Sequence, residues 1–199
     1  MPPPPQGLVL GSSSPYRREL LARLRLPFRV AVPGVDEAPQ AGEAPAALAQ
    51  RLATLKAEWV ARAQPHDWVI GADQAAECEG AVLGKPGTAE QARAQLAACS
   101  GRVVIFHTAV RLARRGVPGE GHLDRTRVVF RRLSAAEIAR YVELDEPLGC
   151  AGSFRAEGLG VVLFERIESE DPTALVGLPL IWLAAALRRA GFDPLASGA

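Results

Sequence analysis

Apolar residues follow two patterns along this chain, short consecutive runs and a spacing of three or four positions. The short runs predict strands. Runs of consecutive apolar residues, such as Leu8-Val9-Leu10 and Trp68-Val69-Ile70, are typical of buried strands. Two β-rich segments on either side of the turn at residues 116–119 indicate a hairpin. The predicted strands are residues 8–10, 28–30, 68–70, 102–113, 122–133 and 161–167.

The longer pattern, with apolar residues three or four positions apart, predicts helices between these strands. A proline after Ser14 and the capping-box sequences at 88–91 and 134–137 mark helix starts. The predicted helices begin at Pro15, Pro45, Thr88, Ser134 and Pro179. In the helix that begins at Pro45, the positions expected to face the core are Leu48, Leu52, Leu55 and Trp59.

This order of elements predicts the fold class. Strands that alternate with helices, together with one hairpin, favour an α/β protein with a mixed sheet and flanking helices. The 199 residues, 48% of them hydrophobic, suit one domain over residues 1–199 or two lobes around a cleft. We expect residues 1–7 and 196–199 to be flexible tails.

Charge and cysteine usage narrow the class of protein further. The formal net charge of +1 gives no reason to expect a nucleic-acid or membrane partner. The proline-rich start lacks the features of a secretory signal, and no apolar run is long enough to cross a bilayer. Three widely separated cysteines support neither a disulfide framework nor a zinc site, and the three histidines show no ligand spacing. These features favour a reducing, cytoplasmic compartment.

The strongest local signal for chemistry is the segment 11–18, Gly-Ser-Ser-Ser-Pro-Tyr-Arg-Arg. It reads as a strand, a loop of small residues and a helix N-terminus, where free N–H groups and the helix dipole attract anions. Arg17 and Arg18 oppose that dipole at a cost of a few tenths of a kcal/mol, which a bound polyphosphate would remove. The alternative is a solvated helix end whose arginines make surface ion pairs.

A second candidate is Asp73, which follows the apolar run at 68–70. A carboxylate just after a buried strand lies at the edge where open α/β sheets bind ligands. There it can hold Mg²⁺ or orient a water molecule. Taken alone, a turn or cap role for this aspartate is the commoner outcome.

Three further charged residues stay ambiguous at this stage. Lys85 stands in the tight Gly84-Lys85-Pro86 loop, but Pro86 replaces the Ser/Thr of a P-loop, so that assignment is rejected. Lys56 lies at the rim of the predicted apolar stripe and either snorkels to solvent or reaches into a cleft. Glu37 lies in a loop, where a solvated acid is the simpler interpretation.

Taken together, these segments resemble the Maf family of nucleoside triphosphate pyrophosphatases. The resemblance covers the chain from Leu8 to about Leu195 and rests on five ordered motifs. They are LVLGSSSPYRRELLARL, VIGADQ, GKPGTAEQARAQL, GCAGSFRAEGLG and DPTALVGLPL. It implies a two-lobed α/β fold with a cleft, related to the inosine triphosphate pyrophosphatases. It also implies hydrolysis of the α–β phosphoanhydride to a nucleoside monophosphate and pyrophosphate.

The resemblance also implies roles for particular residues. Asp73 would be the catalytic carboxylate, and Asp73 and Glu37 would hold a divalent cation, Mg²⁺ or Mn²⁺. The substrate is a nucleoside triphosphate, and a homodimer is expected. The triphosphate would be contacted by Ser12, Arg17, Arg18, Lys56 and Lys85.

Three positions that differ between branches of the family indicate the nucleotide. Tyr16, Gln74 and Glu157 are similar to the branch that acts on 7-methyl-GTP, whereas the dTTP and UTP branch usually carries Arg, Thr and Gln. A cationic 7-methylguanine favours an aromatic face and a nearby carboxylate, which Tyr16 and Glu157 would supply. In the alternative interpretation Tyr16 is a packing residue and Glu157 a loop acid.

Other functions remain open from the sequence. A dTTP, UTP or other modified-nucleotide pyrophosphatase is one alternative, and a nucleotide-sensing regulator of septum formation is another.

The chain departs from the family in two places. Gly11 stands where the family often has Ala, and residues 75–79 are more polar than usual.

Overall fold

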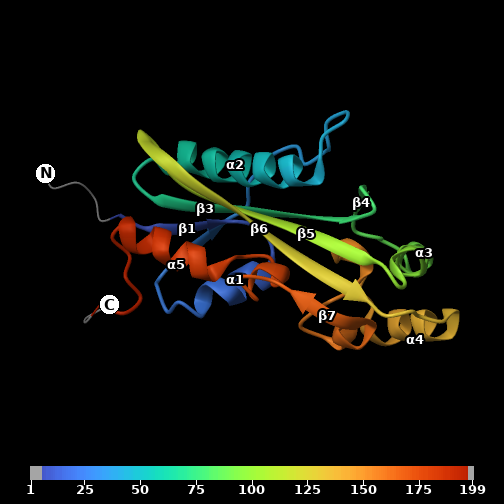
Figure 1. Cartoon of the computed structure of the whole chain (residues 1–199). Coiled ribbons are helices and arrows are strands. Elements are labelled where there is room, and N and C mark those ends of the chain that lie inside the picture. The colour runs from blue at the N-terminus through green and yellow to red at the C-terminus, as the bar shows by residue number, and fades with distance from the viewer. Residues whose placement is uncertain (1–5, 197–199) are drawn as a thin grey trace, which may run out of the picture. The chain divides into compact units, whose positions relative to one another are not determined.

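The structure is a computed structural model that describes residues 6–196, so 1–5 and 197–199 of the predicted tails lie outside it. Figure 1 shows the strands and helices in chain order. The strands are β1 (Leu8–Gly11), β2 (Arg29–Ala31), β3 (Trp68–Cys78), β4 (Ala81–Leu83), β5 (Val103–Arg114), β6 (Val117–Phe130) and β7 (Phe164–Glu168). The helices are α1 (Pro15–Ala22), α2 (Pro45–Ala63), α3 (Ala89–Cys99), α4 (Ala135–Asp145) and α5 (Leu180–Arg189). Three short 3₁₀ helices are η1 (Ala151–Ser153), η2 (Leu159–Leu163) and η3 (Ala174–Val176).

The strands form one mixed sheet, which confirms the predicted fold class. Its order is β2-β1-β3-β5-β6-β7, and β4 pairs with β3 off this path. β1 runs parallel to both β2 and β3, whereas the β3–β4 and β6–β7 pairs are antiparallel. A parallel core with antiparallel additions is common in sheets of this size.

The chain divides into two compact units. The first contains the described residues of 1–74, 108–124 and 171–199, and the second contains 75–107 and 125–170. Strands β3, β5 and β6 each continue from one unit into the other.

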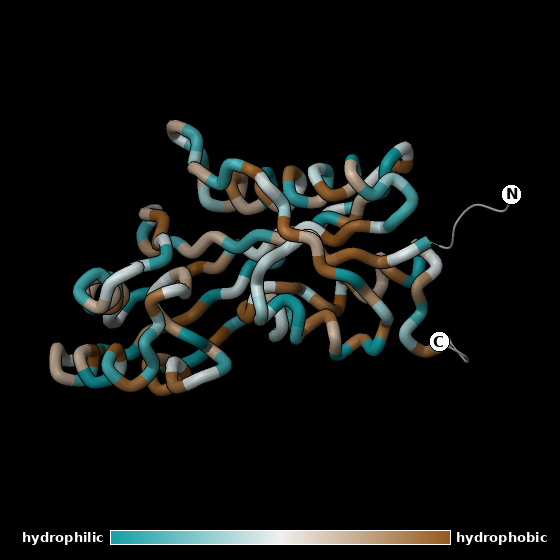
Figure 2. The backbone as a smooth tube through the Cα atoms, turned by 180° about the vertical axis from the view of Figure 1, so that it is seen from behind, coloured by the Kyte–Doolittle hydropathy of each residue, from teal (hydrophilic) through white to brown (hydrophobic). Residues whose placement is uncertain are grey.

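In the first unit, the two faces of the parallel strands bury different partners. Leu8 and Leu10 of β1 and Ile70 of β3 pack with leucines of α1 and α5. Val9 and Val69, one position along, pack with Val60 of α2 instead. This is the two-residue period of a strand that is buried on both faces. Figure 2 shows hydrophobic colour along strands of the sheet, whereas hydrophobic and hydrophilic colours alternate along the turns of α2.

The buried face of α2 differs from the predicted one. Leu48 and Leu52 are buried as expected, but Trp59 is 40% exposed and Leu55 is only partly buried. The buried stripe continues instead through small residues, Ala49, Ala53, Ala57 and Ala61. Alanines contribute little to a hydrophobic pattern, so the prediction overlooked them. Because their side chains are small, they let the helix lie close to the sheet, and this face of α2 is therefore the buried one.

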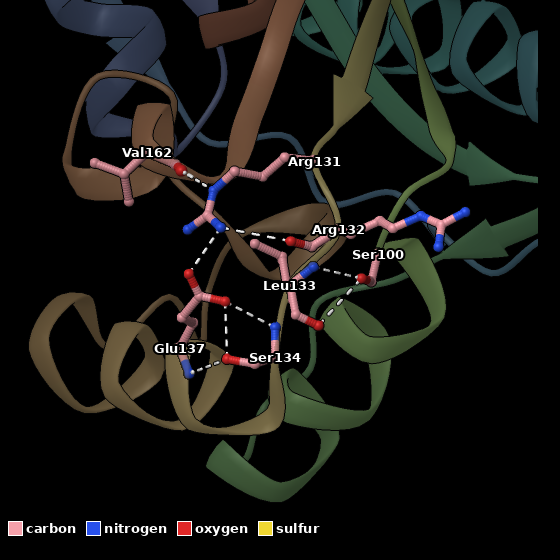
Figure 3. A network of polar contacts seen from close by, with 7 residues as sticks. All are labelled: Ser100, Arg131, Arg132, Leu133, Ser134, Glu137 and Val162. Atoms are coloured by element: carbon pink, nitrogen blue, oxygen red, sulfur yellow. Dashed lines mark hydrogen bonds and ion pairs between the residues drawn. The ribbon is translucent and has the colours of Figure 1, made fainter.

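The second unit is built around the far halves of the long strands, and α4 begins where the sequence predicts. Ser134 Oγ accepts a hydrogen bond from Glu137 N, and a Glu137 carboxylate oxygen accepts one from Ser134 N at 2.8 Å, which completes a capping box. Arg131 joins this cap to η2, because it donates to Glu137 Oε1 at 2.8 Å and to the carbonyl of Val162 at 2.7 Å (Figure 3).

Three strand predictions need correction. β6 begins at Val117, whereas the sequence predicted its start at His122. β3 does not end at residues 71–73 but continues to Cys78, and it stays largely buried there although its residues are less apolar. The segment predicted as a strand from 161 begins as the 3₁₀ helix η2, and β7 starts only at Phe164. Over the part of the chain that the structure covers, no helix is both long and apolar enough to span a bilayer.

Candidate active site

The loop between β1 and α1 is built as the sequence predicts. Ser14 caps α1 by accepting a hydrogen bond from Arg17 N, and Pro15 occupies the first turn. Ser12 is buried, and its Oγ accepts from Ser14 N at 3.2 Å. The helix N-terminus and a buried hydroxyl therefore share one small loop.

Arg17 turns from this helix into the first unit rather than toward solvent. Its Nε donates to the carbonyl of Gly177 at 2.9 Å, and its Nη1 donates to Ser12 Oγ at 3.4 Å. Burial lowers the pKa of the Arg17 guanidinium, and the negative charges of Asp73 and Glu37 act in the opposite direction. Arg17 is therefore a partly buried cation within electrostatic reach of both predicted carboxylates.

Lys56 lies between those two carboxylates. Its Nζ is 2.6 Å from Asp73 Oδ1 and 2.8 Å from Glu37 Oε1. Lys56 and Asp73 are 5% and 8% exposed, whereas the Glu37 side chain is 55% exposed. Of the two alternatives for Lys56, snorkelling to solvent is wrong, because this lysine belongs to the buried face of α2.

Strand periodicity explains why Asp73 meets Lys56. Val69, Gly71 and Asp73 alternate onto the face of β3 that packs on α2. The prediction that Asp73 directly follows the strand is wrong, because Asp73 lies inside β3. However, β1 pairs with β3 only as far as Gly11 and Gly71. Asp73 therefore still projects past the carboxyl end of β1, at the edge where α/β sheets place ligands.

Gly71 sets the distance between the helix and the strand. A Cβ atom there would lie 2.3 Å from Ala53 O and 2.5 Å from Ala57 N, both backbone atoms of α2. Only glycine permits so close an approach, and Lys56 lies between those two contact points along α2. The short Lys56–Asp73 ion pair depends on this contact.

The remaining candidates of the first unit differ in how firmly they are held. Arg18 is exposed and Tyr16 is partly buried. Gln74 points to the opposite face of β3 from Asp73, and its amide nitrogen lies within 3.1 Å of Thr108 Oγ1 and the carbonyls of Ala174 and Leu175. Its amide nitrogen is therefore fully used, and its Oε1 is the atom left to accept a hydrogen bond.

Lys85 and Glu157 belong to the second unit and are both exposed there. The loop that carries Glu157 is anchored by Arg155, whose Nη2 donates to Asp145 Oδ1 at 2.7 Å. Tyr141 donates to Asp145 Oδ2, also at 2.7 Å. The structure brings together Ser12, Arg17, Lys56, Asp73 and Glu37, whereas the position of Lys85 and Glu157 relative to them stays a prediction.

The carboxylates fit the predicted divalent cation in one respect. Asp73 and Glu37 each present an oxygen to a single point, which the Lys56 ammonium takes in this structure. Residues 6–196 contain no group of three or more His, Cys, Asp or Glu side chains that could hold a metal ion. Mg²⁺ sites with one or two protein carboxylates and further oxygens from substrate phosphates and water have this composition.

The motif at residues 171–180 was recognised in the sequence, but none of its residues was assigned a role, although this segment contacts Arg17 through Gly177. Asp171 accepts hydrogen bonds from Thr173 N and from Ile181 N, at 2.9 and 2.7 Å, and so ties η3 to the start of α5. Gly177, in the same segment, has a φ of +125° and offers its carbonyl to Arg17. The Asp-Pro-Thr start and the glycine were visible signals of a turn, but Arg17, the partner of Gly177, lies 160 residues away.

These features define a mixed α/β protein with a cluster of two cations and two carboxylates at the edge of its parallel strands. Residues 7–190 match the family model described as Maf-like protein, and the chain belongs to this family. A 7-methyl-GTP pyrophosphatase of Xanthomonas oryzae pv. oryzae (strain MAFF 311018) is 59% identical over 93% of this chain and 97% of its own length. Another protein with that name, from Cupriavidus metallidurans, is 54% identical over 93% of this chain and 94% of its own length.

A solved structure shows a weaker likeness. It is a nucleoside-triphosphatase / dITP/XTP pyrophosphatase from Mycobacterium abscessus, 16% identical, covering 93% of this chain and 95% of its own, with a TM-score of 0.47. At that level the likeness carries no functional inference.

Proposed function

We propose that this chain hydrolyses the α–β phosphoanhydride of 7-methyl-GTP and releases 7-methyl-GMP and pyrophosphate. The observation that carries the proposal is the convergence of Arg17, Lys56 and Asp73, with Nζ of Lys56 only 2.6 Å from the Asp73 carboxylate. Curated relatives at 51–59% identity, named 7-methyl-GTP pyrophosphatase, support the substrate.

The charges of the cluster suit this reaction. Cleavage at the α-phosphorus develops negative charge on the leaving pyrophosphate, and fixed cations stabilise such charge best where water is excluded. Arg17 and Lys56 are held in place by hydrogen bonds before any substrate arrives. In the proposal, Ser12, the exposed Arg18 and Lys85 add contacts to the same triphosphate.

Asp73 is the residue that we assign to the reacting atoms. Its carboxylate orients the attacking water molecule and accepts its proton, and it holds a divalent cation together with Glu37. Mg²⁺ or Mn²⁺, when bound, supplies positive charge to the phosphate oxygens. Lys56 keeps both carboxylates in position through its two short contacts.

The nucleobase is assigned to Tyr16, Gln74 and Glu157. Tyr16 offers an aromatic face to the cationic ring. Because the Gln74 amide nitrogen already has three acceptors, Gln74 can offer the base only its Oε1. Glu157, on an anchored loop of the second unit, accepts from the N1–H and amino groups of the guanine in this proposal.

Pyrophosphate release from a panel of nucleotides, with Mg²⁺ or Mn²⁺, tests the activity. Asp73→Asn keeps the shape of the side chain but removes its charge, and we expect it to lower kcat by about 10²- to 10⁴-fold while nucleotide binding stays measurable. Glu37→Gln should weaken the dependence on the metal, whereas Glu43→Gln, in the same loop but paired with Arg51, serves as its control. Activity of Asp73→Asn at the wild-type level would refute the assignment.

The choice of nucleotide is tested separately. We expect Tyr16→Arg and Glu157→Gln each to reduce the preference for 7-methyl-GTP over GTP, dTTP and UTP, measured as ratios of kcat/KM. Unchanged ratios in both variants, or wild-type preference for dTTP and UTP, would overturn the substrate but leave pyrophosphate release intact.

We also infer a cytoplasmic homodimer from the family resemblance. Light scattering on the purified chain measures the oligomeric state directly.

A further inference from the structure

A second group of cations lies on the first unit, at the end of the β5–β6 hairpin. A cavity of about 240 Å³ lies there between the last turns of α2 and the turn that joins the two strands. Figure 1 shows the start of β6 beside the end of α2 at this point. None of its lining residues belongs to the candidate active site. Its charged lining residues are Glu58, Arg62, Arg111, Arg114 and Arg115.

The charge in this cavity is poorly balanced. Four guanidinium groups face one carboxylate, and the Glu58–Arg62 pair is exposed and 3.9 Å apart, so it neutralises little. Within residues 6–196, no carboxylate lies at ion-pair distance from the other three arginines. Like charges held in one small space repel one another, and a bound anion relieves that repulsion.

Arg111 is set into this cavity by the absence of two side chains. A Cβ atom on Gly119 would lie 2.9 Å from Arg111 Nη2 and 3.0 Å from its Nε, and one on Gly121 would lie 3.4 Å from Nη1. The guanidinium therefore lies flat along β6 in a channel that two glycines leave open. Its Nε is buried and has no hydrogen-bond acceptor among the described residues, so this guanidinium is not satisfied by the protein itself.

The size and shape of the cavity select the ligand. Planar guanidinium groups match the paired oxygens of a phosphate, and several together match a polyanion. At about 240 Å³ the cavity is smaller than the roughly 300–1,000 Å³ that binds a drug-sized molecule, so it does not enclose a nucleoside. We propose that this cavity is an accessory site for a small inorganic phosphoanion of the pyrophosphate or orthophosphate type. Anion binding in this cavity does not require the proposed catalytic function.

Calorimetric titration of the full chain with sodium pyrophosphate, sodium phosphate and GTP, without metal, tests the proposal. The Arg114→Gln/Arg115→Gln variant loses two contacts, and we expect pyrophosphate to bind to the cavity at least about tenfold more weakly. The control is Arg23→Gln/Arg188→Gln, which removes the same charge from exposed positions of the first unit outside the cavity. An Arg17→Gln arm, altered only in the candidate active site, should retain the cavity binding.

Gly119→Ala adds an independent arm because it keeps every charge. Its methyl group would lie 2.9 Å from Arg111 Nη2 and 3.0 Å from the backbone carbonyl of Leu112, so the guanidinium must leave its channel and pyrophosphate binding should weaken. Equal weakening in the cavity variant and the charge-matched control would overturn the proposal, as would loss of all binding in Arg17→Gln. Tight GTP binding that depends on Arg114 and Arg115, without pyrophosphate binding, would also overturn it, since the ligand would then be a nucleotide.

Discussion

The contact between Gly71 and α2 provides a sharp test of how packing positions the charged cluster. In Gly71→Ala the new Cβ atom would lie 2.3 Å from Ala53 O, whereas ordinary contact begins at 3.4 Å. The helix must therefore retreat by about 1 Å, at an overpacking cost of about 1–3 kcal/mol. Lys56 lies on the displaced turn, so its 2.6 Å contact with Asp73 lengthens beyond hydrogen-bond range. A misplacement of about 1 Å is expected to lower activity about 10²-fold.

Thermal unfolding and pyrophosphate release measure the two effects. The cost in packing corresponds to a Tm lower by roughly 2–12 °C for a chain of this length. Gly11→Ala is the matched control. Its Cβ atom would lie 3.4 Å from Lys56 O of the same helix and 3.3 Å from Ile70 O of β3, and small adjustments absorb such contacts. We expect that variant to keep its Tm and its activity. Wild-type Tm and activity in Gly71→Ala would show that α2 and β3 do not need this close approach.

Two further predictions concern the second unit. Hydrogen bonds from the Ser134 backbone and from Arg131 lower the pKa of Glu137 from 4.5 to about 2, so its contribution to stability is complete above about pH 4.5 and is lost as the pH falls toward 2. The Tm difference between the wild type and Glu137→Gln should therefore shrink over that range, and a difference that grows on acidification would contradict the sign. Asp145→Ala removes the shared acceptor of Tyr141 and Arg155 and should cost about 1–3 kcal/mol by urea unfolding, and a cost near zero would show that the network does not hold the loop.

Local signals in the sequence predicted the elements well, because each depends on neighbouring residues. The cap at Ser134 forms with Glu137 three residues later, and the apolar run at 68–70 carries a strand preference in its own residues. The depth of Lys56 was not predictable in this way. Its burial follows from the alanine stripe of α2 and from Gly71 on another element.

The candidate site shows the same division between local and distant causes. The β1–α1 loop and its arginines were visible in one short segment of sequence. The acceptors of Gln74 lie 34, 100 and 101 residues away, and no spacing rule connects them. The resemblance to a family supplied the candidate site residues as a set, whereas the contacts that hold each of them are visible only in the structure.

The balance of charge in the cluster limits how the site can work. Lys56 and Asp73 are almost fully buried, and an unpaired ion there would cost several kcal/mol. In this structure Lys56 bridges Asp73 and Glu37, whereas the field of the two carboxylates only partly offsets the burial of Arg17, whose pKa stays lowered. A triphosphate alone would add several negative charges beside two carboxylates, and a divalent cation alone would displace the ammonium from its acceptors. Only the two together let Lys56 and Arg17 turn to phosphate oxygens while the carboxylates keep a cationic partner.

We therefore expect nucleotide and metal to bind with positive cooperativity, such that each ligand raises the affinity of the wild-type enzyme for the other. In Asp73→Asn, where one negative charge is gone, nucleotide affinity should depend less on the metal, and an unchanged dependence would refute this account.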